Sequence, residues 1–586
     1  MVKRIAVIEK EKCIDGKGCT FVCGSVCPVN RTGEECIRLG SDNKPIIDES
    51  LCIGCGICSK RCPVSCISII NLPEEFDQEP IHRYGKNEFE LFNLPTPIFG
   101  KVVGILGVNG IGKSTAIKIL AGLLKPNLGD LEKEADVDQL IEYFKGTESQ
   151  LFFEKIKQGE IKISYKPQQV DLIPKSQRGK VKDLLKKVDE KNQLNEIAKE
   201  LQIENILDND IKKISGGELQ RVAIAASVLK KANLYVFDEP TSYLDIKQRI
   251  RVAKFIKKLA DEGTAVLVVE HDLIILDYMT DLVHIMYGKQ GVFGVVSQPK
   301  ATRQAINVYL SGYLKEENVR FRDHVIKFEA RPPIKKIAAN VLTSWENIKK
   351  KLGKFNLKSE KGLIYRNDVV GILGENGIGK TSFVKILANV IEADKGKIIQ
   401  KITVSYKPQY LESDSDELVI NILQEAVQKY TNQIINPLNI KPLLDKKLNE
   451  LSGGELQRVS IALCLSKKAD LYLLDEPSAY LDVEQRLIVS KIIRDIMEQR
   501  GCSALVVDHD LLFIDYLSQR LLVFDGIPAK EGEAKGPFDM EEGMNVFLED
   551  LGITFRRDLE SNRPRTNKEG SVKDREQKEK GKYYYV

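Results

Sequence analysis

The sequence of 586 residues contains no run of about 20 consecutive apolar residues, which a membrane-spanning helix requires. Its first residues, Met-Val-Lys-Arg-Ile-Ala-Val-Ile-Glu, lack the apolar segment of a signal peptide. Neither sign of charge dominates, because 88 Lys and Arg against 84 Asp and Glu leave a formal net charge of only +4. These absences predict a cytoplasmic protein that does not enter a membrane. They also argue against a DNA-coating protein or an acidic scaffold.

Cysteine is nearly absent from most of the chain. Ten of the 12 cysteines lie within the first 66 residues, and only Cys464 and Cys502 lie beyond them. In a secreted miniprotein this density would indicate disulfides, but without an export signal it favours metal or cluster ligation.

The spacing of these cysteines points to iron–sulfur chemistry. One run followed by Pro63 has the pattern C-x2-C-x2-C-x3-C-P of bacterial ferredoxins, in which the fourth cysteine ligates the other cluster of a pair. A second, more widely spaced group precedes Pro28. This crossed pattern predicts two [4Fe–4S] clusters, one held by Cys13, Cys19, Cys23 and Cys62 and the other by Cys52, Cys55, Cys58 and Cys27. Zinc is the alternative metal, and we expect Cys36 and Cys66 to be buried small residues rather than ligands.

Two nearly identical phosphate-binding loops follow in the remainder of the chain. Residues 107–114 and 374–381 both fit G-x-x-x-x-G-K-[ST], and an apolar run typical of a buried strand precedes each. In such a P-loop the backbone N–H groups surround phosphate oxygens, the lysine reaches the β- and γ-phosphates, and the hydroxyl ligates Mg²⁺. Two copies predict two ATP sites in one chain.

Five further motifs recur in the same order after each P-loop: Tyr-Lys-Pro-Gln, Ser-Gly-Gly-Glu-Leu-Gln, Asp-Glu-Pro, Tyr-Leu-Asp and an acidic residue before His-Asp. The strand ending in Asp238 or Asp475 places a carboxylate beside Mg²⁺, and the Ser-Gly-Gly-Glu segment opens a helix whose dipole favours an anion. The next carboxylate is positioned to polarise the attacking water, and the histidine can contact the γ-phosphate. The predicted catalytic residues are therefore Glu239, Glu476, His271 and His509. The predicted Mg²⁺ residues are Ser114, Gln168, Asp238, Thr381, Gln409 and Asp475.

This motif order resembles the ATP-binding cassette (ABC) family. The resemblance implies that the two cassettes meet head to tail, so that Lys113 faces Ser452 across one ATP and Lys380 faces Ser215 across the other. It also implies an aromatic residue against adenine, for which Tyr84, Phe89 and Phe355 are candidates. The expected ATP-binding residues are Gly107, Asn109, Gly110, Gly112, Lys113, Ser114, Thr115, Gln168, Ser215, Gly217, Gly374, Asn376, Gly377, Gly379, Lys380, Thr381, Ser382, Gln409, Ser452 and Gly454.

The two copies differ in length at one place. The first carries about 26 additional residues between its P-loop and Gln168, with apolar spacing of helical type on both sides of Gly146. We predict a helix–loop–helix insertion whose aromatic pairs, Tyr143-Phe144 and Phe152-Phe153, supply a packing face and anchors for a partner. The alternative is a tolerated surface insertion without a binding role. The connector between the cassettes and the C-terminal tail are rich in Lys and Arg, and can contact RNA phosphates. The last charged stretch of the tail is expected to be disordered.

A ferredoxin-like module ahead of two cassettes resembles one branch of the ABC family, subfamily E, or the RNase L inhibitor family. The segments that carry the resemblance are residues 51–58, 69–73, 82–84, 94–97 and 109–113, together with the insertion. The resemblance implies an ATPase that splits ribosomes into subunits after termination or stalling. It further implies contact with the small subunit and its ribosomal RNA, and a release-factor-like partner in the A site. The alternative function is an ATP-gated iron–sulfur electron carrier.

The predicted fold class is α/β, with two head-to-tail nucleotide-binding domains behind a ferredoxin-like α+β domain. We expect a monomer in which the cassettes pair within the chain. The predicted boundaries are 1–75 for the iron–sulfur domain, 76–293 for the first cassette with its insertion at about 134–160, 294–340 for a basic hinge, 341–545 for the second cassette and 546–586 for a C-terminal hinge segment and tail.

Overall fold

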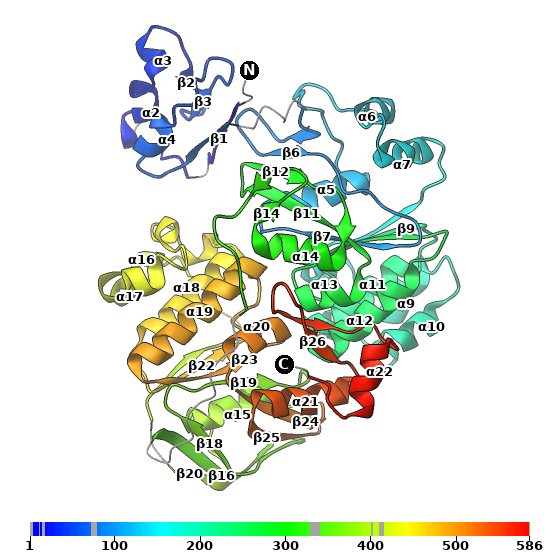
Figure 1. Ribbon diagram of the computed structural model, residues 1–586, viewed down its shortest axis with the longest axis vertical. Helices are drawn as coiled ribbons and strands as arrows, with labels where there is room; N and C mark the ends of the chain where they lie inside the picture. The colour runs from blue at the N-terminus through cyan, green and yellow to red at the C-terminus, as the bar shows by residue number, and fades with distance from the viewer. Residues whose placement is uncertain are drawn as a thin grey trace.

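The computed structural model describes residues 4–10, 12–14, 18–71, 79–328, 340–399, 402–409 and 415–584. Figure 1 shows a small N-terminal module at one end, two α/β cassettes below it, and a C-terminal segment that lies between the cassettes. The predicted fold class is confirmed. The predicted boundary between residues 75 and 76 lies outside the described residues.

The N-terminal module is built from short elements around its cysteines. Its two antiparallel pairs join β1 (Arg4–Ile8) to β4 (Ile67–Asn71) and β2 (Ile37–Leu39) to β3 (Pro45–Ile47). Three short helices stand beside them: α2 (Val22–Ser25), α3 (Pro28–Arg31) and α4 (Ile57–Arg61). Many of the buried side chains in the module are thiols, so little apolar core is available to hold it together.

The first cassette contains a nine-stranded sheet in which the adjacent strands β11, β7, β10, β9 and β8 run parallel, with β8 at the edge. Strand β7 is buried along its whole length, as expected for a parallel strand covered by helices on both faces. The strands are, in sheet order, β5 (His82–Arg83), β6 (Glu90–Phe92), β12 (Phe293–Val296), β11 (Leu282–Lys289), β7 (Val102–Leu106), β10 (Ala265–Val269), β9 (Leu234–Asp238) and β8 (Ile163–Lys166), with β13 (Lys300–Ala301) beside β11.

The helices of the first cassette begin where the motifs predict. P-loop, signature and His-Asp segments each open a helix: α5 (Lys113–Leu120), α11 (Gly216–Val228) and α13 (Leu273–Met279). The other helices are α6 (Val137–Tyr143), α7 (Glu148–Lys157), α8 (Ile173–Ser176), α9 (Val181–Val188), α10 (Leu194–Glu200), α12 (Ile246–Leu259) and α14 (Thr302–Ser311).

The second cassette repeats this plan with a ten-stranded sheet. Its strands are, in sheet order, β18 (Gly362–Tyr365), β16 (Val341–Leu352), β17 (Phe355–Ser359), β25 (Glu531–Asp539), β24 (Arg520–Ile527), β19 (Val369–Leu373), β23 (Ser503–Val507), β22 (Leu471–Asp475) and β21 (Val404–Lys407), with β20 (Lys395–Ile398) beside β16. Its helices are α15 (Lys380–Leu387), α16 (Val419–Ile422), α17 (Gln424–Lys429), α18 (Gly453–Ser466), α19 (Val483–Arg500), α20 (Leu511–Leu517) and α21 (Met540–Leu551).

Two predicted boundaries cut through regular elements. The boundary at residue 293 falls at the start of β12, and β13 also pairs within the first sheet, so that cassette extends at least to Ala301. The boundary at residue 545 falls inside α21. These boundaries were misplaced because a charged linker and an amphipathic element at the edge of a domain have similar amino-acid composition.

The C-terminal segment is folded, so the expectation of disorder in its last stretch is wrong. It forms the hairpin β26 (Phe555–Arg557) and β27 (Pro564–Thr566) and then α22 (Val572–Glu579). Its arginines bind inward: Arg563, fully buried, lies 3.3 Å from Asp277 of the first cassette, and Arg557 lies 2.8 Å from Asp515 of the second. The segment therefore joins the two cassettes.

The connector between the cassettes uses its basic residues in the same way. After the short hairpin β14 (Tyr313–Leu314) and β15 (Val319–Arg320), the buried Arg322 lies 3.3 Å from Glu484 of the second cassette. Arg303 on α14 lies 2.8 Å from Asp558 of the C-terminal segment. Through these contacts the connector binds the second cassette and the C-terminal segment.

The insertion is a helical pair, as predicted, formed by α6 and α7 and broken at Gly146 with φ of +80°. It lies at the outer edge of the first cassette (Figure 1). Phe144, Phe152 and Phe153 are buried and pack on one another, so they hold the insertion to the cassette. The predicted packing face is therefore confirmed for the phenylalanines, but their burial leaves them unavailable as anchors for a partner.

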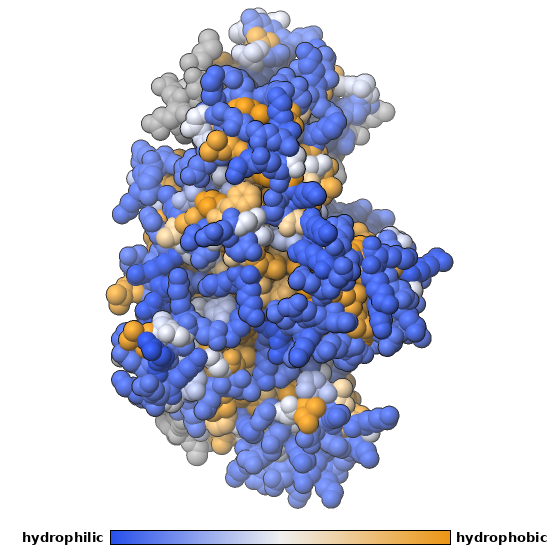
Figure 2. Space-filling model, turned by 90° about the vertical axis from the view of Figure 1, so that its right-hand side faces the viewer, coloured by the Kyte–Doolittle hydropathy of each residue, from blue (hydrophilic) through white to orange (hydrophobic). Residues whose placement is uncertain are grey.

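Figure 2 shows one face of the molecule, on which hydrophilic side chains predominate and hydrophobic ones form small scattered areas. Among the described residues no helix has the length and apolar character needed to cross a bilayer.

Candidate functional site

Each P-loop connects a buried strand to a helix and holds its lysine in place. Lys113 Nζ donates to the carbonyl oxygens of Gly107 and Val108 at 2.9 and 2.8 Å. Burial lowers the pKa of Lys113 to about 8, although nearby carboxylates oppose this shift. A buried ammonium group at the mouth of a P-loop is suited to bind phosphate oxygens. Lys380 repeats both contacts at 2.7 Å in the second cassette.

Glycine is required in these loops by geometry. Gly112 has φ of +93°, and a Cβ there would lie 2.7 Å from the Phe89 ring. Gly379 has φ of +96°, and a Cβ there would lie 2.8 Å from Phe355. The rings of Phe89 and Phe355 thus pack directly against the two P-loops. Tyr84 is 51% exposed, and its hydroxyl lies 3.0 Å from Thr115 Oγ1, so it is the candidate with a face free for adenine.

The Mg²⁺ candidates meet at the end of the sheet. Ser114 Oγ donates to Asp238 Oδ2 at 3.1 Å, and Thr381 Oγ1 donates to Asp475 Oδ2 at 2.7 Å. Asp238 Oδ1 is buried and makes no hydrogen bond within the described part of the chain. A hydroxyl beside a carboxylate oxygen without a partner is a donor set that fits Mg²⁺.

The catalytic candidates adopt a strained backbone. Glu239 and Glu476 have φ of 46° and 47°, a left-handed conformation that costs a residue with a Cβ about 1 kcal/mol or more and is found at functional sites. Gln168 Nε2 donates to Glu239 Oε1 at 2.7 Å, and Gln409 Nε2 donates to Glu476 Oε1 at 2.6 Å. The structure thus brings each predicted glutamine to its predicted glutamate.

The histidines complete the two sites. His271 Nε2 lies 3.3 Å from Glu239 Oε1, and His509 Nε2 lies 3.6 Å from Glu476 Oε1. Among the described residues no group makes a well-directed hydrogen bond to either ring, and both rings are buried. Burial lowers the pKa of His509 well below its usual value, so this imidazole is neutral at pH 7.

The two glutamates differ in their electrostatic surroundings. Burial alone would raise the pKa of Glu239, but His271, Lys113 and Gln168 outweigh it and hold that pKa at about 2. Burial raises the pKa of Glu476 to about 7, and the carboxylates of Asp508 and Asp475 add to the effect. The two candidate catalytic glutamates therefore differ in how readily they take up a proton.

The cassettes meet head to tail, as the resemblance to the ABC family implied. Asp482 of the second cassette accepts a hydrogen bond from the Asn109 N–H at 3.2 Å, and Asp245 of the first accepts from the Asn376 N–H at 3.1 Å. Each signature serine, Ser215 or Ser452, caps the helix that follows it. In the signature loops, a Cβ at Gly217 or Gly454 would lie 3.0 Å from the carbonyl of a tyrosine in the same cassette.

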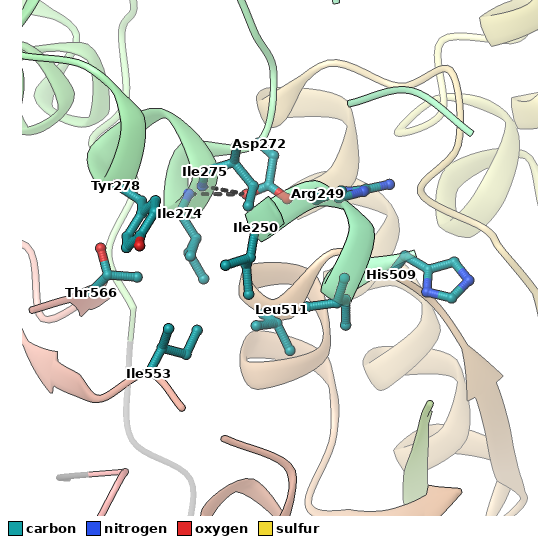
Figure 3. A pocket seen from close by; sticks show the side chains of 11 residues that line it. Arg249, Ile250, Asp272, Ile274, Ile275, Tyr278, His509, Leu511, Ile553 and Thr566 are labelled. Atoms are coloured by element: carbon teal, nitrogen blue, oxygen red, sulfur yellow. Dashed lines mark hydrogen bonds and ion pairs between the residues drawn. The ribbon is translucent and has the colours of Figure 1, made fainter. Parts of the chain in front are cut away.

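Charged groups continue this interface beyond the ATP sites (Figure 3). Asp272 accepts hydrogen bonds from Ile274 and Ile275 at the start of α13, and lies 3.0 Å from Arg249 of α12. Figure 3 shows Arg249 extending toward His509 of the other cassette. Its charge also helps to lower the pKa of His509.

One contact exists at only one ATP site. Lys247 Nζ lies 2.6 Å from Glu375 in the second P-loop and 2.7 Å from Asp550 on α21. At the other site the matching positions hold Glu484 and Val108, which cannot form an ion pair.

Sequence reasoning missed a buried lysine in each cassette. Lys166 Nζ donates to the carbonyl oxygens of Asp238 and Glu239 at 3.0 and 3.2 Å, and Lys407 Nζ donates to that of Asp475 at 2.8 Å. The missed signal was a repeated lysine at an inward position of a β-strand, where charge is costly without a partner. These lysines hold the strained Asp-Glu turn.

The cysteines fall into the two predicted neighbourhoods. The Cys23 thiol is surrounded by Cys13, Cys19 and Cys62, and the Cys58 thiol by Cys27, Cys52 and Cys55. Burial raises the pKa of Cys23 to about 11 and that of Cys58 to about 12, with further rises from the neighbouring thiols. Within the described residues no three His, Cys, Asp or Glu side chains converge tightly enough for a single metal ion. A [4Fe–4S] cube takes one thiolate at each of its four irons, and each of the two neighbourhoods contains the four thiols predicted for it.

The two remaining thiols in this module lie next to the predicted ligands. Cys66 Sγ is 3.4 Å from Cys62 Sγ, and Cys36 neighbours Cys27 and Cys52. Both are buried, as expected for packing residues.

The chain matches known sequence families in three places. Residues 98–242 and 357–479 match the ABC transporter family, and residues 45–68 match the 4Fe-4S binding domain. These matches cover both P-loops and one cysteine run. The chain therefore carries two ABC-type ATPase cassettes and an iron–sulfur binding region.

Related proteins extend over the full length. An uncharacterized ABC transporter ATP-binding protein of Methanocaldococcus jannaschii is 53% identical over 100% of this chain and 98% of its own. ABC transporter E family member 1 of Arabidopsis thaliana is 43% identical over 100% and 99%. Translation initiation factor RLI1 of Saccharomyces cerevisiae is 44% identical over 100% and 98%.

Two solved structures are similar as well. An archaeal ABCE1, described with Pelota as ribosome-bound, is 53% identical over 100% of both chains with a TM-score of 0.93. An archaeal ribosome recycling factor, aABCE1, in complex with the stalk protein aP1, is 55% identical over 87% of this chain and 99% of its own, with a TM-score of 0.82. With twin cassettes, a cysteine module and full-length relatives of this identity, the chain belongs to the E family of ABC proteins, the RNase L inhibitor family, and is an ABC-type ATPase.

Proposed function

We propose that this protein is a ribosome recycling factor that uses ATP to split ribosomes into subunits after termination or stalling. The observation that carries the proposal is the attachment of the cysteine module to one cassette of a head-to-tail pair. When such a pair closes on ATP, a module fixed to one cassette must move relative to the other. The similar structures described as ribosome-bound, or as a recycling factor, support this reading.

The attachment consists of a hairpin turn inserted into the module. The Ile47 N–H donates to Asn87 Oδ1 at 2.8 Å, and Asn87 Nδ2 donates to the Ala6 carbonyl at 3.0 Å. Arg83 lies 2.7 Å from Glu49. Buried polar contacts of this kind fix orientation as well as position, so the module would follow the first cassette as a rigid attachment.

The ATP chemistry follows from the placed side chains. The P-loop lysines would bind the phosphates, while Ser114, Gln168 and Asp238 would hold Mg²⁺, as would Thr381, Gln409 and Asp475 in the second site. Glu239 and Glu476 would orient the attacking water, with His271 and His509 at the γ-phosphate. Mg²⁺ would supply charge neutralisation between the phosphates. The remaining ATP-binding residues are those predicted from the sequence.

The cysteine module would hold two [4Fe–4S] clusters. Cys13, Cys19, Cys23 and Cys62 would take one, and Cys52, Cys55, Cys58 and Cys27 the other. The grouping of the thiols around Cys23 and Cys58 supports this division. The clusters would stabilise a module that has little apolar core.

The partners would be the small ribosomal subunit with its RNA and a release-factor-like protein in the A site. Pelota accompanies the ABCE1 structure similar to this chain. The protein would act as a monomer, because both ATP sites are completed within one chain. It would act in the cytoplasm, where ribosomes are found.

Ribosome splitting measured on sucrose gradients tests the function. Purified ribosomes with the protein, ATP and a release-factor-like partner should separate into subunits, and the variant Glu239→Gln/Glu476→Gln should bind the small subunit without recycling. Intact ribosomes in every gradient, with no protein in any ribosomal fraction, would refute the proposal. Subunit separation that does not require ATP would refute the ATP-driven mechanism.

A further inference from the structure

Three lysines lie side by side on adjacent strands of the second cassette. In the register of the sheet, Lys349 of β16 is directly opposite Lys358 of β17 on one side and Lys395 of β20 on the other. Directly opposite residues have Cβ atoms about 5 Å apart, so these side chains form a row of like charge. Lys351 follows on the same face of β16, two residues along the strand.

This row faces outward. Lys349, Lys358 and Lys395 are exposed, whereas Ile348 and Leu357, which alternate with them along the strands, are buried in the core. Lys351, Lys354 and Lys397 are also exposed. We call the exposed lysines 349, 351, 354, 358, 395 and 397 the basic face.

The three lysines of the row have no carboxylate partner among the described residues. Lys350 lies 2.7 Å from Asp394 and Lys361 lies 3.4 Å from Glu346, so nearby carboxylates serve other lysines. Glu533 on β25 is opposite Lys358 in the register but forms no ion pair with it. Like charges directly opposite one another destabilise a sheet. Repulsion among the three lysines in register therefore lowers the stability of the isolated protein.

In the first cassette, the equivalent hairpin turn is covered by the cysteine module. Phe89 and Phe355 support equivalent P-loop glycines, so the turn at Asn87 corresponds to the turn at Gly353, and both have positive φ. Asn87 is inserted into the cysteine module. A Cβ at Gly353 would meet nothing within 4 Å. The hairpin that docks a module in the first cassette is thus longer, basic and uncovered in the second.

Figure 1 places this hairpin at the opposite end of the molecule from the cysteine module. We propose that the basic face binds the phosphate backbone of ribosomal RNA. Among the described residues this face combines a row of three lysines with no exposed aromatic side chain, which fits a backbone of regularly spaced phosphates and is not suited to reading bases. The proposal rests on the ribosome recycling function only for the source of the RNA.

Salt-dependent binding of the full-length chain to a 20-base-pair RNA duplex tests the basic face. Each phosphate contact contributes about 0.7 to 0.9 to the slope of log K against log salt. The variant Lys349→Gln/Lys358→Gln/Lys395→Gln should therefore lower that slope by about two to three. The control variant Lys186→Gln/Lys187→Gln/Lys230→Gln removes the same charge from exposed positions of the first cassette, and should keep the slope. An equal loss in both variants would overturn the proposal.

A charge reversal separates binding from folding. Lys349→Glu puts a carboxylate between Lys358 and Lys395, so it should raise the melting temperature while weakening RNA binding several-fold. Unchanged RNA binding in this stabilised variant would overturn the proposal. So would competition by poly-glutamate as strong as that by RNA, since it would assign the face to an acidic protein. Neither measurement depends on ribosome splitting, so these failures are distinct from failure of the proposed function.

Discussion

The ion pairs of Lys247 predict that the two ATP sites release nucleotide at different rates. Lys247 follows Asp245, which contacts the second P-loop, and it adds Glu375 of that loop and Asp550 of α21 to the contact. The first P-loop has Val108 in place of Glu375, and there Glu484 faces Arg322 of the connector instead. Lys247→Met removes the bridge and keeps most of the side-chain volume.

The expected magnitude is modest. The side chains of Lys247 and Glu375 are 31% and 26% exposed, and that of Asp550 is 54% exposed, so solvent screens both pairs. Each such pair contributes about 0.5 kcal/mol. Together they account for about 1 kcal/mol, which corresponds to about a fivefold faster release from the second site.

Release of a fluorescent ATP analogue from the Glu239→Gln/Glu476→Gln protein measures this effect. The two sites appear as separate phases, which are assigned with Lys113→Met and Lys380→Met. Lys247→Met should accelerate only the phase that depends on Lys380. The matched variant Glu484→Gln removes the counterpart pair, and should accelerate the phase that depends on Lys113.

Two results would refute the reasoning. Equal acceleration of both phases by Lys247→Met would mean that the lysine stabilises the whole cassette pair and not one site. No acceleration in either phase would mean that the paired side chains are no more stable than the same side chains hydrated separately.

The remaining predictions concern the general bases, the clusters and the insertion. Because the pKa of Glu476 is raised to about 7 and that of Glu239 is held at about 2, hydrolysis by Glu239→Gln should fall about tenfold per pH unit below pH 7, as the remaining base is protonated. Hydrolysis by Glu476→Gln should stay level over that range, and parallel profiles would contradict the difference. Cys27→Ser, prepared without oxygen, should lower iron from about eight to about four atoms per chain, and full iron content would exclude Cys27 as a ligand. Replacing residues 136–158 by a short Gly-Ser bridge should preserve ATP binding and weaken small-subunit association, whereas normal splitting would make the insertion dispensable.

The local geometry of the candidate ATP sites could be predicted because it depends on fixed spacing: a P-loop requires glycine where φ is positive. The cysteine grouping was accessible for the same reason. The hydrogen bond from Gln168 to Glu239 was not predicted, because it joins motifs that are far apart in the sequence. Head-to-tail pairing came from resemblance, since no local pattern encodes which cassette faces which.

The roles of the basic segments could not be predicted, because charge composition does not reveal the partner. Arg322 and Arg563 looked like residues of a solvated or RNA-binding segment, yet both are buried against carboxylates from distant parts of the chain. In the sequence, the lysines of β16 and β17 look like those of an ordinary polar hairpin. Only the strand register shows that they stand opposite one another.

The asymmetry of this molecule is greatest outside its candidate ATP sites. Lysine, serine or threonine, glutamine, glutamate and histidine occupy matching positions in both sites, although the Lys247 ion pairs and the surroundings of the two glutamates differ. The larger difference is in what each cassette carries: a cysteine module and a helical insertion on the first, and an exposed basic hairpin on the second. A symmetric pair would open and close without moving one end of the molecule differently from the other. With different attachments at opposite ends, the proposed closure would displace one end of the molecule relative to the other, which is the motion that the proposed separation of two subunits requires.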